Sequence, residues 1–163
     1  MDNKYLLNRN WVVWYHGVND KKWDIESYKQ LGIIYNINDY NNIINNIKSV
    51  MAGMFFIIHK GITPRWEDKQ NIKGGALTLK ISKKVIDDIW VKLVAALIGE
   101  SLTEDPENMK YINGISISPK INNVIIKIWT NQCNLNINTL LSVKLDFLNG
   151  IPKIFKKYNC SAF

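Results

Sequence analysis

The sequence predicts an α+β fold in which one antiparallel sheet is backed by helices. Short runs rich in β-branched and aromatic residues recur along the chain, and two of them, 112–118 and 124–129, flank a turn at Pro119–Asn123 as in a β-hairpin. The segments between such strands carry apolar side chains on one helical face only. The chain contains no repeat and no low-complexity linker, so residues 1–163 are expected to form a single domain.

The first predicted elements are two strands and a helix. Trp11–Tyr15 is a compact aromatic and β-branched run, and Tyr28–Tyr35 is a second candidate strand, interrupted at Gly32. An amphipathic helix follows, with Asn38 or Asp39 as its expected N-cap, because short polar side chains accept hydrogen bonds from the first free N–H groups. Its apolar face consists of Tyr40, Ile43, Ile44 and Ile47.

The middle of the chain predicts two strands and a long helix. Met54–His59 is an apolar run typical of a buried strand, and Ala76–Ile81 alternates with period two, as in a half-buried strand. Ser82 is the expected N-cap of the helix, and Gly99 is its expected end. The apolar face of this helix holds Val85 or Ile86, Ile89, Trp90, Leu93, Val94 and Leu97.

The last third begins with an acidic, proline-containing loop at 102–110 and continues with the hairpin described above. A third helix is predicted over Ile137–Leu148, closed by Asn149 and Gly150. Lys153–Lys157 is the expected final strand.

The net charge of +7 and a pI near 9.3 favour a polyanionic partner, although a basic domain without such a partner has the same charge. A hydrophobic fraction of 47% and six Trp indicate a globular chain. We see no signal-peptide pattern and no apolar run long enough to span a membrane, so a cytoplasmic location without a membrane partner is expected. Cys133 and Cys160 form no CxxC motif and are expected to be reduced thiols rather than zinc ligands.

Two tryptophans lie in polar loops, and one of them stands next to a carboxylate. Trp66 and Glu67 belong to the loop Gly61–Asp68, and Trp23 belongs to another polar loop far upstream. Two indole rings can enclose a flat cationic ring, with roughly 1–3 kcal/mol of stacking on each. A carboxylate can accept hydrogen bonds from two neighbouring N–H groups on a guanine edge. The pattern therefore predicts binding of 7-methylguanosine, the mRNA cap.

Each of these residues also has a purely structural interpretation. Trp66 and Glu67 would then be a packed loop tryptophan beside a solvated acid, and Trp23 would be a packed loop residue. The tryptophans in predicted strands or helices are expected in the core: Trp11, Trp14 and Trp90.

Six short motifs occur in an order and spacing shared by one known family: Asn8–Trp14, Lys22–Trp23, Pro64–Asp68, Leu97–Ser101, Ile128–Thr130 and Gly150–Ile154. From about Leu7 to Tyr158 the chain resembles the eukaryotic translation initiation factor 4E family, the mRNA cap-binding proteins. The resemblance implies a strongly curved antiparallel β-sheet with about three helices packed on its convex face and a ligand slot on the concave face.

The resemblance also implies roles for four residues of the slot. Trp23 and Trp66 would stack on the two faces of the cap guanine. The Glu67 carboxylate would accept from guanine N1–H and N2–H, and the backbone N–H of Trp66 would donate to O6. Trp129 would contact the N7-methyl group.

The expected phosphate-binding residues depart from the family pattern. Ala76 replaces an arginine that usually follows the double glycine, and Ile125 replaces a lysine. Lys120 matches a phosphate-binding arginine, and Lys127 lies two residues beyond Ile125, hence on the same face of its strand. Lys120 and Lys127 are therefore the expected phosphate ligands, and a solvated side chain is the alternative for each. Lysine supplies a point charge without the fork of arginine.

The surface that binds a partner in the family also differs. Family members recruit a scaffold factor through a helical peptide that packs on a tryptophan of the first helix, and Asn41 occupies that position here. Lys92 replaces an acidic residue of the second helix. An aromatic anchor of this kind commonly contributes about 2 kcal/mol or more, so weak or no binding of the standard scaffold peptide is expected. A dedicated partner with a different motif, such as a viral one, is the alternative.

The leading hypothesis is a monomeric protein that binds capped mRNA and recruits it to a scaffold partner in translation initiation. The alternatives are a cap-sequestering regulator or decoy, which Asn41 and Lys92 favour, and a basic RNA-binding module without cap specificity. No catalytic, metal or cofactor site is expected, because no nucleophile–base motif or ligand cluster occurs, and His16 and His59 are isolated. The abundance of Asn, Ile and Lys indicates an A+T-rich gene and favours a large DNA virus or a reduced parasite as the source.

Overall fold

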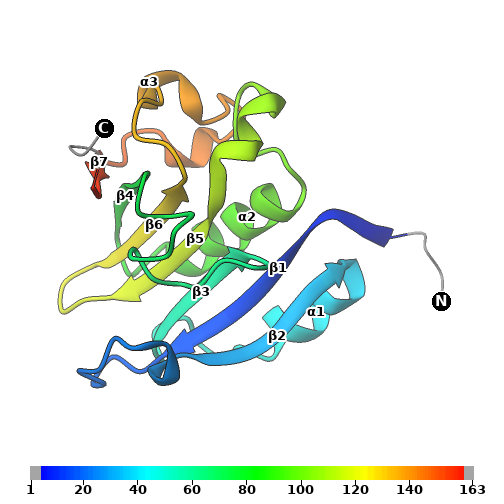
Figure 1. Ribbon diagram of the computed structural model, residues 1–163, viewed down its shortest axis with the longest axis vertical. Helices are drawn as coiled ribbons and strands as arrows, with labels where there is room; N and C mark the ends of the chain where they lie inside the picture. Colours follow the sequence, from blue (N-terminus) through cyan, green and yellow to red (C-terminus); the bar gives the residue numbers. More distant parts are fainter. Residues whose placement is uncertain (1–4, 160–163) are drawn as a thin grey trace.

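The computed structural model describes residues 5–159, which form an open, curved antiparallel sheet of seven strands with helices on one face (Figure 1). The strand order is β2-β1-β3-β5-β6-β4-β7, so β2 and β7 are the two edges. The predicted α+β class with an antiparallel sheet is confirmed. The strands are β1 (Leu6–His16), β2 (Lys29–Asn36), β3 (Met54–His59), β4 (Gly75–Ile81), β5 (Ile112–Pro119), β6 (Val124–Thr130) and β7 (Lys153–Lys157).

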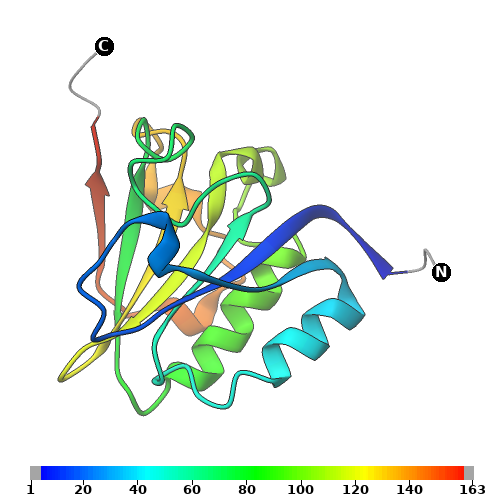
Figure 2. The same cartoon turned by 60° about the horizontal axis from the view of Figure 1, so that its bottom comes forward.

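Two α-helices, α1 (Ile37–Asn45) and α2 (Ile86–Ile98), cover the same face of the sheet (Figure 2). Eight of the 13 residues of α2 are buried, whereas α1 has none, so α2 is the central helix and α1 covers the β1–β2 end. The apolar residues of α2 recur every three or four positions, and this spacing places them on the stripe that packs against the sheet.

The N-caps of both helices differ from the prediction. The side chain of Asn36 caps α1 by accepting from the Asp39 N–H at 2.9 Å, and Asp39 in turn accepts from the Tyr35 N–H at 2.9 Å. Ser82 lies one turn before α2, which begins at Ile86 without a side-chain cap.

The predicted third helix is only a single turn, α3 (Ile137–Leu140), followed by a short 3₁₀ turn at Asp146–Leu148. The chain leaves the helical conformation at Leu141, which forms an isolated antiparallel bridge with Thr103. This tertiary pairing overrides the helical pattern of the segment, whose apolar residues still reach the core: Leu140, Leu145 and Leu148.

The sheet separates two apolar clusters. The larger cluster, on the helical face, contains Trp11 and Trp90, both buried as expected. The smaller cluster lies on the opposite face, and Trp14 packs half-buried against it instead of lying in the main core. We call this second group the slot cluster: Tyr28, Met54, Phe56, Ile58, Ile62 and Trp129.

Within residues 5–159, none of the helices is both long enough and apolar enough to cross a membrane. Cys133 is disulfide-bonded, contrary to the expectation of a reduced thiol. Cys160 lies outside the described residues.

Candidate functional site

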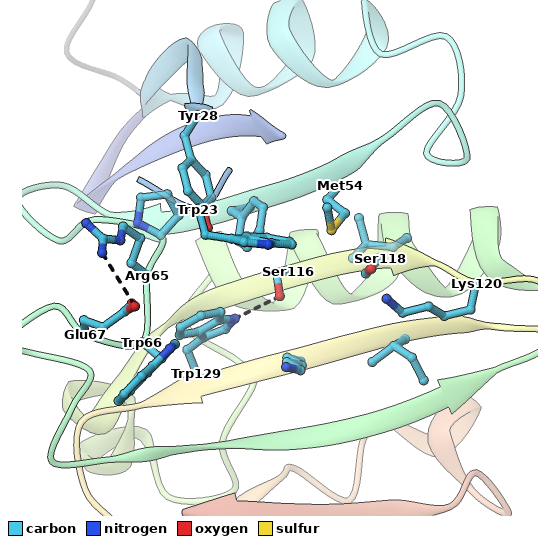
Figure 3. Close-up of a pocket in the computed structure, with 15 residues that line it drawn as sticks. Trp23, Tyr28, Met54, Arg65, Trp66, Glu67, Ser116, Ser118, Lys120 and Trp129 are labelled. Carbon is cyan, nitrogen blue, oxygen red and sulfur yellow. Dashed lines mark hydrogen bonds and ion pairs between the residues drawn. The ribbon is translucent and has the colours of Figure 1, made fainter. Parts of the chain in front are cut away.

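A cavity of about 420 Å³ opens on the sheet face opposite the helices, over the slot cluster (Figure 3). Its floor comes from β3, β5 and β6, and its rim comes from the loop after β1 and the loop between β3 and β4. The structure places all the residues predicted to contact a guanine or its phosphates along this one cavity: Trp23, Trp66, Glu67, Trp129, Lys120 and Lys127.

The loop that carries Trp66 is fixed from inside by two polar side chains. Asp68 accepts from the N–H and from the hydroxyl of Thr63, both at 2.8 Å. The fully buried Asn71 donates to the Thr63 carbonyl at 3.1 Å and to the Arg65 carbonyl at 2.7 Å. Because these bonds satisfy backbone groups that would otherwise be unpaired, they hold the loop in one conformation.

A second asparagine joins this loop to the sheet. Asn113 of β5 is 2% exposed, and its amide donates to Asn71 Oδ1 at 2.8 Å and to the Gln70 carbonyl at 2.9 Å. Sequence reasoning missed Asn71 and Asn113, because neither has ligand-binding chemistry and they lie 42 residues apart in the chain. Only the fold brings them together.

The Glu67 carboxylate lies at the cavity wall beside Arg65 (Figure 3). Arg65 Nη2 is 3.6 Å from Glu67 Oε1, and both side chains are partly exposed, so this ion pair contributes little to stability. Burial raises the pKa of Tyr28 to about 12, with Arg65 lowering it and Glu67 raising it further. Tyr28 therefore lies close to both charges and lines the cavity, a position that the sequence did not predict.

One face of the Trp23 ring packs against a histidine ring. The Trp23 and His16 rings are stacked, with centroids 4.3 Å apart and planes at 4°. His16 is fully buried, and its ring nitrogens lie 2.9 Å from the Gly17 carbonyl oxygen and 2.7 Å from the Lys22 carbonyl oxygen. One face of Trp23 is thus covered by a fixed ring, while the side chain as a whole remains 51% exposed.

Trp129 forms part of the cavity floor and is only 6% exposed. Its indole N–H donates to Ser116 Oγ at 2.9 Å, which fixes the orientation of the ring. Tyr158 bridges this floor to the rim, since its ring centroid is 5.8 Å from that of Trp129 and 6.2 Å from that of Trp66. Burial raises the pKa of Tyr158.

The two predicted phosphate ligands lie along the cavity at its β5–β6 end. Lys127 of β6 pairs with Ser116 of β5, and Lys120 lies exposed in the turn between these strands. Burial lowers the pKa of Lys127, and the neighbouring ammonium groups of Lys156 and Lys120 lower it further. Ile125 also lines the cavity.

The predicted partner residues lie on the helices, hence on the other side of the sheet. Asn41 is exposed on α1. Lys92 Nζ lies 2.7 Å from Asp88 Oδ2 and 5.5 Å from the centre of the Phe147 ring. A second cavity of about 250 Å³ lies between α2 and the end of α1 with the loop that follows it. Its apolar lining is Ile44, Ile47, Val50, Trp90 and Val91. Neither Asn41 nor Lys92 lines it.

In the part of the chain that the structure describes, no cluster of three or more His, Cys, Asp or Glu side chains could hold a metal ion. The main cavity offers aromatic faces, one carboxylate, a guanidinium, ammonium groups and serine hydroxyls.

Comparison with known proteins identifies relatives with the same fold. The chain is 29% identical over 143 residues to eukaryotic translation initiation factor 4E of Candida albicans, covering 80% of this chain and 66% of that protein. It is 32% identical over 135 residues to the factor 4E homolog of Acanthamoeba polyphaga mimivirus, covering 69% and 50% respectively. The chain thus spans between half and two thirds of the length of these relatives.

Among solved structures, the complex of Ascaris suum eIF4E-3 with the m2,2,7G cap superposes with a TM-score of 0.81 at 25% identity, covering 98% of this chain and 94% of that one. The family model of eukaryotic initiation factor 4E matches residues 6–156, which include every strand except the last residue of β7. On this match, together with the curved sheet and its cavity, the chain belongs to the eukaryotic initiation factor 4E family.

Proposed function

We propose that this chain binds the 7-methylguanosine cap of mRNA in the main cavity. The observation that supports the proposal is the meeting of two loop tryptophans and a carboxylate, from segments more than 40 residues apart, along one cavity. Trp23 is 51% exposed and Trp66 is 47% exposed, so both rings have surface available for stacking. Such large exposed apolar rings at a cavity are typical of ligand sites.

Each group has a defined part in this proposal. N7-methylation makes the guanine cationic, and the indoles of Trp23 and Trp66 attract a cation held against their faces. Glu67 accepts from guanine N1–H and N2–H, a charge-assisted pair, and the Trp66 backbone N–H donates to O6. Trp129, oriented by Ser116, contacts the methyl group. The function is binding, without a chemical step.

The phosphates of the cap would lie at the β5–β6 end of the cavity. Lys120 and Lys127 line this end, and their ammonium groups attract phosphate oxygens without the bidentate geometry of arginine. Since Lys127 already lies near two other lysines, an anionic ligand would relieve repulsion among them.

Titration of tryptophan fluorescence with 7-methyl-GTP and with GTP tests the cap site. We expect strong quenching by the methylated nucleotide, a weak response to GTP, and a roughly ten- to hundredfold loss of affinity in Glu67→Gln, which removes the charge from the acceptor. Glu107→Gln, an exposed glutamate that does not line the cavity, is the matched control. Equal, weak quenching of the wild-type protein by both nucleotides would contradict the proposal.

For the cellular role, we propose recruitment of capped mRNA to a partner in translation initiation, through the helical face. The cavity between α1 and α2 is one apolar surface on this face. Asn41, one helical turn before Ile44 on the same side of α1, replaces the aromatic anchor of the family pattern. This substitution favours a dedicated partner, or the second candidate function, a cap-sequestering regulator that recruits no scaffold.

Fluorescence anisotropy with a labelled scaffold peptide of the standard helical motif separates these cases. We expect weak or no binding to the wild-type chain and a gain of about 30-fold or more in Asn41→Trp, if the missing anchor is the cause. Cap affinity should not change in this variant, because Asn41 lies on the opposite side of the sheet. Tight binding of the standard peptide to the wild-type chain would contradict both the dedicated partner and the decoy.

A further inference from the structure

The last strand of the sheet, β7, presents one lysine to the cavity face. Lys156 pairs with Ala76 of β4, and Ala76 pairs on its other side with Trp129 of β6. Directly paired residues of an antiparallel sheet point to the same face, so Lys156 shares the face of the cavity floor. Phe155, its neighbour in β7, packs instead on the helical-face cluster, in agreement with this alternation.

Lys156 is close enough to the predicted phosphate ligands to interact with them. Lys127 pairs with Thr78 in β4, two residues from Ala76 and on the same face. Lys156 and Lys120 are the two charges that lower the pKa of Lys127, after burial itself. The three ammonium groups therefore form one positively charged region, the lysine cluster Lys120, Lys127 and Lys156.

In the part of the chain that the structure describes, no salt bridge joins a lysine of this cluster to an acid. Within residues 5–159, the ion pairs are Arg65–Glu67, Lys92–Asp88 and Lys110–Glu107, and none of them involves a lysine of the cluster. Like charges gathered without partners raise the free energy of the unliganded protein and attract a polyanion. Ala76, which is 1% exposed, contributes no charge at the centre of this region.

We infer that Lys156 is a phosphate ligand of the bound cap, supplying from β7 the positive charge that Ala76 does not supply from β4. The ligand groups are the phosphates attached to the base that the cavity holds, and Lys156 completes the set formed by Lys120 and Lys127. This inference rests on the proposed function of the cavity. Part of the phosphate contact would then come from the edge strand β7 instead of from β4 inside the sheet.

Affinities for 7-methylguanosine, 7-methyl-GDP and 7-methyl-GTP, measured with Lys156→Ala and Lys157→Ala, test the inference. Lys157 is the matched control, because it is also an exposed lysine of β7 and its pairing with Gly75 places it on the helical face. We expect Lys156→Ala to weaken 7-methyl-GTP binding roughly three- to tenfold. This loss is larger than that expected for an exposed ion pair and smaller than that expected for a hydrogen bond to a charged group. Binding of the nucleoside should stay unchanged.

The dependence of 7-methyl-GTP affinity on salt is the second readout, since loss of a phosphate contact makes this dependence shallower. Lys156→Arg should retain most of the affinity and the salt dependence. Equal 7-methyl-GTP affinities of Lys156→Ala and Lys157→Ala would overturn the inference, as would an equal loss for nucleoside and triphosphate. Failure of the proposed function looks different: the wild-type protein would then not distinguish 7-methyl-GTP from GTP.

Discussion

The fully buried side chain of Asn71 forms three hydrogen bonds: two to carbonyls of the loop that carries Trp66, and one that joins this loop to Asn113 of β5. Asn71→Ala would leave two carbonyl groups and the Asn113 amide without these partners. We expect a loss of about 1–3 kcal/mol in the free energy of unfolding, measured by urea denaturation. We also expect weaker 7-methyl-GTP binding under conditions in which the variant is fully folded.

Asn45→Ala is the control for this prediction, because Asn45 is exposed on α1 and far from the loop. It should change neither quantity by more than about 0.5 kcal/mol. A folded Asn71→Ala variant with unchanged cap affinity would show that other contacts suffice to position Trp66.

Residue chemistry alone predicted the residues that line the cavity more readily than those that support them. Trp23, Trp66 and Glu67 were identifiable because two loop indoles and an adjacent carboxylate match the chemistry of a flat cationic ring. Tyr28 and Lys156 were not, because their positions depend on the fold: Tyr28 lines the cavity from the turn before β2, and Lys156 shares the cavity face only through its register with β4. The roles of all these residues in cap binding stay predictions.

At the scale of elements, β5 is irregular at its start, where Asn113 joins the loop that carries Trp66 to the strand that forms part of the cavity floor. The register of β5 with β6 shifts between Ile112 and Gly114, and Gly114 has a φ of 152°. A Cβ at Gly114 would lie 2.2 Å from the Ile57 carbonyl oxygen, closer than real contacts allow. We expect Gly114→Ala to lower the free energy of unfolding by about 2 kcal/mol or more.

Gly61→Ala is the matched comparison in thermal or urea unfolding, because Gly61 also has a positive φ, of 95°, but a Cβ there would meet no atom within 4 Å. Its cost should be the backbone strain alone, about 1 kcal/mol. Similar losses in both variants would mean that the close approach of β5 and β3 at Gly114 relaxes easily.

The strands were predictable because their apolar runs and alternation follow from the two-sided pleat. The helix boundaries were harder to predict from the sequence. The cap of α1 is Asn36, before the predicted positions, and the third helix shrank to one turn because Leu141 pairs with Thr103. The cap of α1 is set by hydrogen bonds within the local segment, whereas the third helix is shortened by a contact with a distant segment. Hydrophobic periodicity reports neither kind of contact.

At the scale of the whole molecule, the sheet separates two surfaces of different chemistry. The main cavity, with its aromatic rim and the lysine cluster, lies on one face, and the apolar cavity between α1 and α2 lies on the other. If the proposed function holds, changes on the helical face alter partner choice without affecting the main cavity. The net charge of +7 predicted a polyanionic partner, but only the fold gathers Lys120, Lys127 and Lys156 on one face.

Tyr158 follows directly after β7, and its ring contacts both Trp66 at the rim and Trp129 in the floor. Its backbone N–H donates to the Gly74 carbonyl at 3.0 Å, which extends the attachment of the edge strand by one residue. If β7 separated from β4, both Trp66 and Trp129 would lose their contact with the Tyr158 ring. Occupancy of the cavity and local unfolding of the last strand are therefore linked equilibria, so that a bound ligand stabilises the C-terminal edge of the sheet.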